Sequence, residues 1–453
     1  MDNNDYAILH GPPLRTFIAY AVPSLLGLLA ISTASIIDGI FVGHYLGADA
    51  LAAINLLVPY ITFMFAVCLM IAIGGSVMAG HYLGENKSLQ ANQIFTLSLF
   101  SALAFTCLMA LLSHLLYIHL FQLLGAPPSL FSLMKEYLSV MSFCLVIQLT
   151  TMVCYYFVRT DGFPRLGTTA LLCGAACNIA LDALFIGYFR WGLAEAALAT
   201  TLAQCLQCVV LSRYFFQTKR RLAFCLNRLP LRTLGHALRN GCSEFINEIS
   251  VGIIIFAVHW QVASQHGEAG IAGFAITNYI LFISMMMFYG IIDAQHVLLS
   301  HNLGAGQPQR AHTFMRFATL AIACIGGGIT LFTFIGKTWI TTLFLGTGEL
   351  DAALFAHQYL NWLWPCILLS GFNVLFSGYF TAHQRPKPSA CIALLRGLLL
   401  PLLFLFLFTV WPISWHVLAA LPLAEGITLL IAIGLYLHQI RHSASAIQAC
   451  GHE

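Results

Sequence analysis

Long apolar segments dominate this sequence and constrain its fold more than any other feature. A helix needs about 20 mostly apolar residues to cross the hydrocarbon core of a bilayer. Only 8% of the 453 residues are charged, whereas a soluble domain carries about 25%. We therefore predict an all-α, polytopic membrane protein with twelve transmembrane helices. The predicted segments are 15–40, 51–78, 93–119, 133–157, 167–189, 193–217, 241–263, 270–299, 313–342, 355–382, 389–411 and 413–439.

The Lys and Arg residues gather on one side of the predicted bundle. With the N-terminus in the cytoplasm, most of the 20 fall in cytoplasmic connections, and only Lys135, Arg190 and Lys337 lie on the opposite side. Arg396 is left inside a segment. The positive-inside rule then places both termini in the cytoplasm. The chain is expected in the cell inner (cytoplasmic) membrane, which it crosses many times.

The sequence repeats across a basic connection at its middle. Gly80-His-Tyr-Leu-Gly84, after the second segment, is similar to Ser300-His-Asn-Leu-Gly304, after the eighth. Six helices per half make the repeat parallel, an arrangement that places a substrate between the halves and works by alternating access. The predicted divisions are an N-terminal six-helix bundle at 1–217, a cytoplasmic linker at 218–240, a C-terminal six-helix bundle at 241–442 and a cytoplasmic tail at 443–453.

Carboxylates within the first half are the strongest functional candidates. Asp38 lies deep in the first segment, where insertion of a charge costs about 2.5–3.5 kcal/mol. Asn178 and Asp182 are one turn apart, so they share a helix face. Such groups can hold a proton or coordinate Na⁺, and the other interpretation is that they only staple helices together. The repeat places Leu400 and Phe404 opposite this pair, so the ion machinery is expected in the first half.

Pro23 lies near the start of the same segment as Asp38. Proline lacks the amide hydrogen that would complete the helical ladder, so it weakens the helix there. A proton arriving at Asp38 would then change the hydrogen bonds around a bend at Pro23. A static kink is the alternative interpretation.

Acidic and sulfur-containing residues of the second half are candidates for a substrate cavity. Glu244 and Glu248 share a face of the seventh segment and either attract cations into a cavity between the halves or reach the membrane surface. Met285 and Met286 would supply a plastic apolar wall.

Three more charged residues lie within apolar segments of the second half. Asp293 of the eighth segment is predicted to pair with Arg396 of the eleventh as a structural staple. Glu425 follows Pro422, and its role is left open.

Several other classes of protein are disfavoured. No HExxH, GxxxxGK[ST] or GxSxG motif is present, which argues against a zinc protease, a P-loop ATPase and a serine hydrolase. The 14 cysteines lie mostly in apolar runs, where they act as small buried hydrophobes. We therefore expect no enzyme, no cofactor, no firm metal site and no nucleic-acid partner. The remaining partners are the lipid bilayer and small organic molecules.

Two motifs give the chain a resemblance to a known family. The chain resembles the multidrug and toxic compound extrusion (MATE) transporters in these motifs. The first is Ile37-Asp38-Gly-Ile-Phe-Val-Gly43 with the following His-Tyr-Leu-Gly47, and the second is Asn178-x-x-x-Asp182. The resemblance implies two six-helix bundles arranged as a V. It also implies ion coupling at Asp38, Asn178 and Asp182, and helix bending at Pro23, as in the DinF-like branch. The NorM-like branch has a glutamate at the position of Val251 here, and Glu248 lies one turn earlier.

These features together predict a secondary active antiporter. It would export cationic or amphiphilic organic compounds, including drugs, in exchange for protons or sodium by alternating access, and would work as a monomer. The runner-up is a flippase or exporter of a lipid-linked or polysaccharide intermediate. Such a flippase should present several cations to a pyrophosphate, whereas Arg396 is the single deep cation in the sequence.

Overall fold

The computed structural model describes residues 8–226, 230–345, 350–410 and 417–450, and these residues contain helices but no strand. Eleven helices in the described ranges are long and apolar enough to cross a membrane. The longest covers two of the twelve predicted segments, and the last predicted segment begins at 413, outside the described residues. The predicted all-α membrane class is confirmed.

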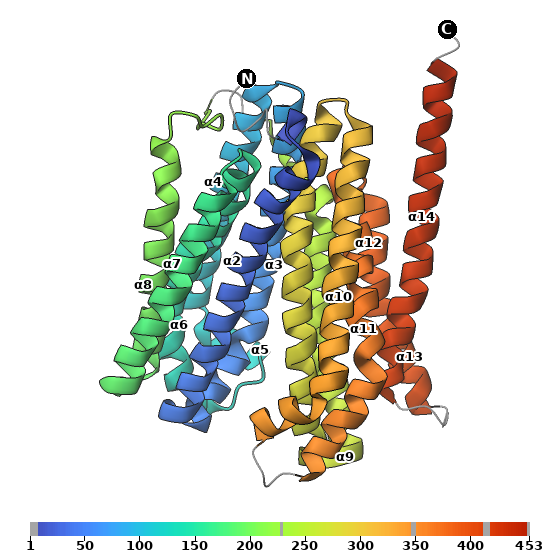
Figure 1. Cartoon of the computed structure of the whole chain (residues 1–453). Helices are drawn as coiled ribbons and strands as arrows, with labels where there is room; N and C mark the ends of the chain where they lie inside the picture. The colour runs from blue at the N-terminus through green and yellow to red at the C-terminus, as the bar shows by residue number, and fades with distance from the viewer. Residues whose placement is uncertain (1–7, 227–229, 346–349, 411–416, 451–453) are drawn as a thin grey trace.

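The first half of the chain forms one bundle of helices, drawn from blue to green in Figure 1. Two of its helices, α2 and α7, pack against each other, and α6 packs against α3, α4 and α8. Its long elements are α2 (Pro13–Phe41), α3 (Ala48–Gly84), α4 (Ser88–Leu115), α6 (Phe131–Thr160), α7 (Pro164–Asp182) and α8 (Leu193–Ser212), with short elements η1 (Val42–Leu46), α5 (Tyr117–Leu123), η2 (Pro128–Leu130), η3 (Ala183–Tyr188) and η4 (Arg213–Phe216).

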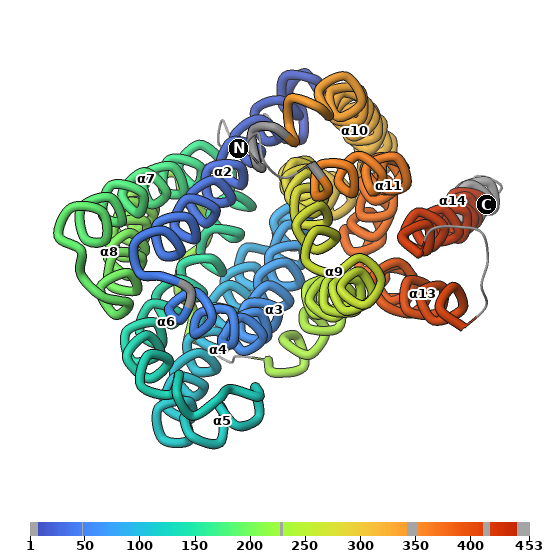
Figure 2. The backbone as a smooth tube through the Cα atoms, turned by 90° about the horizontal axis from the view of Figure 1, so that it is seen from below, coloured from blue at the N-terminus to red at the C-terminus, as the bar shows by residue number. Residues whose placement is uncertain are grey.

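The second half forms a separate bundle beside the first, as the view along the helices in Figure 2 shows. Its α11 packs against α9, α10, α12 and α14. The elements are α9 (Leu231–Gly304), α10 (Pro308–Leu345), α11 (Leu350–Ala382), α12 (Pro386–Leu394), η5 (Leu395–Leu399), α13 (Leu400–Val410), η6 (Val417–Ala419) and α14 (Ala420–Cys450).

A single glycine divides α9 into two membrane-crossing arms. A straight helix of 74 residues would be about 110 Å long, far more than the roughly 30 Å of a bilayer core. Gly267 has φ 59° and ψ −150°, a conformation that is essentially restricted to glycine. The chain reverses there, so the two arms correspond to the predicted segments 241–263 and 270–299.

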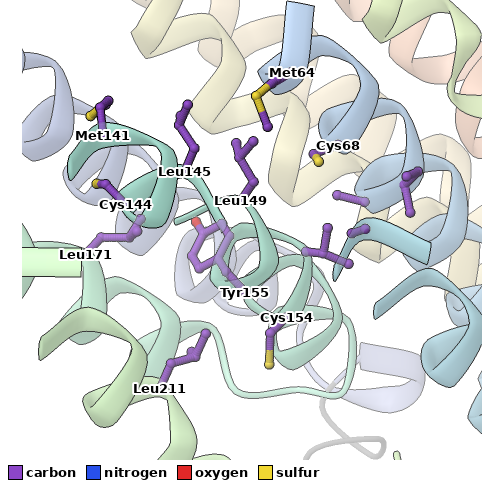
Figure 3. Packing of buried hydrophobic residues seen from close by; sticks show 14 of the residues in the cluster. Met64, Cys68, Met141, Cys144, Leu145, Leu149, Cys154, Tyr155, Leu171 and Leu211 are labelled. Atoms are coloured by element: carbon purple, nitrogen blue, oxygen red, sulfur yellow. The ribbon is translucent and has the colours of Figure 1, made fainter. Parts of the chain in front are cut away.

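Each bundle has its own apolar core. The largest core cluster lies in the first half and the next two lie mainly in the second. Figure 3 shows part of the first cluster, with Cys144 near Leu145 and Leu171, and Cys154 near Tyr155. These cysteines therefore serve as buried apolar side chains. Among the described residues, no group of three or more His, Cys, Asp and Glu is placed to hold a metal ion.

The halves contact each other chiefly through α9, which packs along α3 and α2. Near the ends of α3 and α9, His81 and Gly304 approach so closely that a Cβ atom on Gly304 would meet the His81 backbone. His81 also hydrogen-bonds through Nε2 to the carbonyl oxygen of Ala382 on α11, at 2.7 Å. These contacts close the seam between the halves at the end of the molecule where the N-terminus lies (Figure 1).

Helical structure extends into segments predicted to be polar connections. α9 begins at Leu231, within the predicted linker 218–240, because Ala237 packs against α3 and extends the apolar face. Residues 227–229 of that linker lie outside the described residues. α14 continues to Cys450, so the predicted tail 443–453 is helical in part, and residues 451–453 lie outside the described residues.

Candidate functional site

Asp182 is a completely buried carboxylate in the first half. It is the last residue of α7, its exposed fraction is 0%, and neither carboxylate oxygen has a hydrogen-bond partner within the described part of the chain. A buried carboxylate without partners is costly, since desolvation penalises its charge and no donor compensates. The position therefore favours a bound proton or cation.

Asp38 lies close to Asp182 and is half-buried on α2. The two carboxylates interact electrostatically with each other, and both interact with Tyr137 of α6. Packing between α2 and α7 brings the carboxylates together. The structure thus places Asp38 and Asp182 in one region, as the sequence predicted, and adds Tyr137, which is almost fully buried.

Asn178 is buried one turn before Asp182, on the side of α7 that faces α8. Its Nδ2 donates to Oγ1 of Thr200 at 3.4 Å. The side chain is therefore oriented by α8. Sequence reasoning missed Thr200 and Tyr137, because a hydroxyl in an apolar segment more often bonds to its own helix.

A π-helical turn follows each of the two acids. α2 passes into η1 shortly after Asp38, and α7 passes into η3 at Asp182. A π turn carries one extra residue and occurs frequently at functional sites. The third π turn of the described chain, η5, contains Arg396.

A cavity of about 250 Å³ lies within the second half. Its wall is largely apolar and includes Glu248, Met285, Met286 and Val251, together with Asn278. Glu248 has no hydrogen bond or ion pair within the described residues, so its charge faces the cavity without a partner.

Glu244 is buried one turn before Glu248 and does not line the cavity. Its predicted place on the wall of a cavity between the halves stays a prediction, because this cavity lies within the second half. Its side chain instead lies near Asn247 and Asp293, since it faces the seam with the first half.

Arg396 and Glu425 form a buried ion pair at the edge of this cavity. Arg396 Nη2 lies 3.1 Å from Glu425 Oε1. Ser370 donates to the same oxygen at 2.9 Å, and Asn373 Nδ2 donates to Oε2 at 2.6 Å. Glu425 thus neutralises the guanidinium and is itself saturated with donors.

The predicted pair between Asp293 and Arg396 is wrong. Asp293 Oδ2 instead accepts from Arg159 Nη1 at 2.9 Å, with side-chain exposures of 5% and 1%. Arg159 is the penultimate residue of α6, and sequence reasoning treated it as a cytoplasmic topology signal. Its second amino group donates to the Ser24 hydroxyl, next to Pro23 on α2.

The first half holds a buried acid without a partner in the described residues, and the second half holds a largely apolar cavity that includes Glu248. Two bundles of membrane helices with these features are typical of membrane transporters. The family model MatE matches residues 23–184 and 245–407. The chain therefore belongs to the MatE (MATE) family, whose members are transporters and not enzymes.

Characterised proteins share this architecture at low sequence identity. The chain is 22% identical over 408 residues to the multidrug export protein MepA of Staphylococcus saprophyticus, covering 88% of this chain and 89% of that protein. It is 25% identical over 420 residues to an FAD transporter of Shewanella oneidensis, covering 88% of each. A MOP superfamily transporter from Pyrococcus furiosus superposes with a TM-score of 0.88 at 20% identity, covering 98% of this chain and 99% of that one. The predicted V-shaped fold of two six-helix bundles is confirmed.

Proposed function

We propose that this protein exports cationic or amphiphilic organic compounds in exchange for protons or sodium, by alternating access. The carrying observation is Asp182, whose buried oxygens have no partner in the described chain while the Asp38 charge acts on it. Two carboxylates so placed repel each other until a proton or cation arrives. Ion binding would therefore lower the free energy of the first-half conformation in which Asp38 and Asp182 lie close together.

Coupling requires that the ion favour one conformation more than the other. Asp38 lies on α2, which also carries Pro23. Neutralising Asp38 would remove a repulsion between α2 and α7, and a bend at Pro23 would let the two ends of α2 respond separately. Asn178 would orient the bound ion from α7.

The second-half cavity supports an organic cation as the cargo. Its wall is mostly apolar, and Glu248 supplies a carboxylate without a partner in the described residues. Arg396 does not offset that charge, because Glu425 already neutralises it. A hydrophobic cation would satisfy both features. FAD and lipid pyrophosphates are anionic, and the same cavity offers them no free cation.

We also propose that the protein is a monomer in the inner membrane with both termini in the cytoplasm. We further propose that it belongs to the DinF-like branch of the family. The family matches begin at residues 23 and 245, which supports a division into bundles at 1–217 and 241–442.

The test is transport in proteoliposomes loaded with ethidium, under an imposed pH gradient or an imposed Na⁺ gradient. We expect one of the two gradients to drive ethidium movement and Asp182→Asn to abolish it. Glu136→Gln removes an exposed carboxylate of α6 and serves as the matched control.

If gradient-driven ethidium movement persists in both Asp38→Asn and Asp182→Asn, the proposed ion site is refuted. Movement of FAD, in place of ethidium, would refute the cargo class. Transport with no dependence on either gradient would refute antiport.

A further inference from the structure

A buried ion pair joins the two halves of the molecule. Arg159 ends α6 in the first half and Asp293 lies in the second arm of α9. Their contact spans 2.9 Å between Nη1 and Oδ2, with almost no solvent exposure. The Tyr155 ring lies under the guanidinium, 5.2 Å from ring centroid to Cζ. Most other long-range ionic contacts in the described chain, such as Arg396 with Glu425, stay within one half.

The same guanidinium also binds α2, the helix that carries Asp38. Its Nη2 donates to the Ser24 hydroxyl, and Ser24 donates in turn to the Tyr20 carbonyl at 2.6 Å. α2 comes close enough for this because Gly290 of α9 has no side chain: a Cβ there would lie 2.7 Å from Leu25 Cα. Three helices from both halves therefore meet at Arg159.

We infer that Arg159, Asp293 and Ser24 form an inter-half latch that holds the molecule closed at the end where the N-terminus lies and releases when α2 moves. This inference rests on the proposed alternating-access function. It assigns gating roles to residues that belong neither to the candidate ion site nor to the cavity lining.

The latch favours the closed state because its parts are buried together only there. When that end opens, α6 and α9 separate and both charges meet water, so the pair contributes nothing to the open state. Removing one charge leaves the other buried and unpaired in the closed state, which is strongly unfavourable. The open state carries no such penalty, so the conformational equilibrium shifts toward it.

Ser24 explains how the ion site would reach the latch. It lies on the same helix as Asp38 and directly after Pro23. A change of bend at Pro23 displaces the Ser24 hydroxyl relative to Arg159. The Nε of Arg159 has no hydrogen-bond partner in the described residues, so the network is incompletely satisfied and is sensitive to the loss of one more bond.

The experiment is hydrogen–deuterium exchange of the purified full-length protein in lipid nanodiscs, read at connections 84–88 and 304–308. We expect Asp293→Asn, and separately Arg159→Gln, to raise the open-to-closed ratio roughly 100-fold, and so to speed exchange at both connections. The double variant removes both charges of the pair, so neither is left unpaired, and it should return exchange toward the unaltered protein. Ser24→Ala should speed exchange less than either.

The matched control is Glu425→Gln, which breaks a buried ion pair of the same chemistry inside one half. It lowers the stability of the second half without removing a contact between the halves, so it should speed exchange at the two connections less than either latch variant. Unaltered exchange in both single variants, or equal acceleration by Glu425→Gln, would overturn the latch. Exchange is measured without a gradient or cargo, so a failure of ion-coupled transport leaves this result independent.

Discussion

Glu425 carries the sharpest stability prediction. Its carboxylate accepts two partly buried bonds from Arg396 and two buried bonds, one from Ser370 and one from Asn373. Glu425→Gln keeps the shape of the side chain and removes the charge. The guanidinium of Arg396 then remains in the interior with no counterion, and the new amide faces the Asn373 amide donor.

The expected loss of stability is about 3–5 kcal/mol, the cost of removing one partner of a buried pair. For a unit the size of the second half, each kcal/mol lowers the melting temperature by about 2–4 °C, so the total is roughly 6–20 °C. The double variant Arg396→Met with Glu425→Gln should recover most of this loss, because no charge stays buried. Met fits there because Arg396 Nη2 already lies 3.9 Å from Met285 Sδ.

The assay is thermal unfolding in detergent, followed by intrinsic tryptophan fluorescence. Glu136→Gln, an exposed carboxylate, should stay within about 0.5 kcal/mol of the unaltered protein. A melting temperature of Glu425→Gln within about 2 °C of the unaltered protein would show that the pair is hydrated, contrary to its burial. A double variant as unstable as the single one would show that packing, not charge, is responsible.

Three further predictions follow from single contacts. Tyr137 interacts electrostatically with Asp38 and Asp182, so Tyr137→Phe should lower gradient-driven ethidium transport about 3- to 10-fold, the value of one polar contact to the bound ion, without lowering the melting temperature. Asp161 accepts from the Tyr214 hydroxyl at 2.6 Å and from the Arg221 backbone amide at 2.8 Å, so Asp161→Asn should speed trypsin cleavage after Arg221. Gly290→Ala should accelerate deuterium exchange at connection 304–308 as the latch variants do, because its new methyl group pushes α2 from α9; normal exchange there would contradict the close approach.

The sequence predicted the helices well, for a physical reason. Twenty apolar residues in a row admit few structures other than a membrane helix. A carboxylate within such a run is costly there, so it is recognised as a functional candidate from its own segment alone. Asp38 and Asp182 could therefore be selected before any contact was known. One predicted pair of helices proved continuous, because Gly267 reverses the chain without a loop.

The partners of the charged residues could not be predicted in the same way. Which cation meets Asp293 depends on how the halves dock, and periodicity within one helix carries no information on that. Arg159 shows the difficulty clearly: an arginine at a segment end indicates topology by count, yet this one is buried. Arg396 was paired with the wrong carboxylate because Glu425 follows a proline in the last segment and its facing direction was unknown.

The π turn after Asp38 gives α2 a way to rotate. An α-helix with one inserted residue forms such a turn, and each residue contributes about 100° of rotation. If the wide turn migrates along the helix, side chains that it passes swing by that angle while most backbone hydrogen bonds persist. Deleting one residue within 42–46 would convert η1 to a regular helix and fix Asp38 in a single orientation. The extra residue thus allows α2 to rotate about its axis near Asp38. Deleting one residue is the smallest change that would remove this freedom.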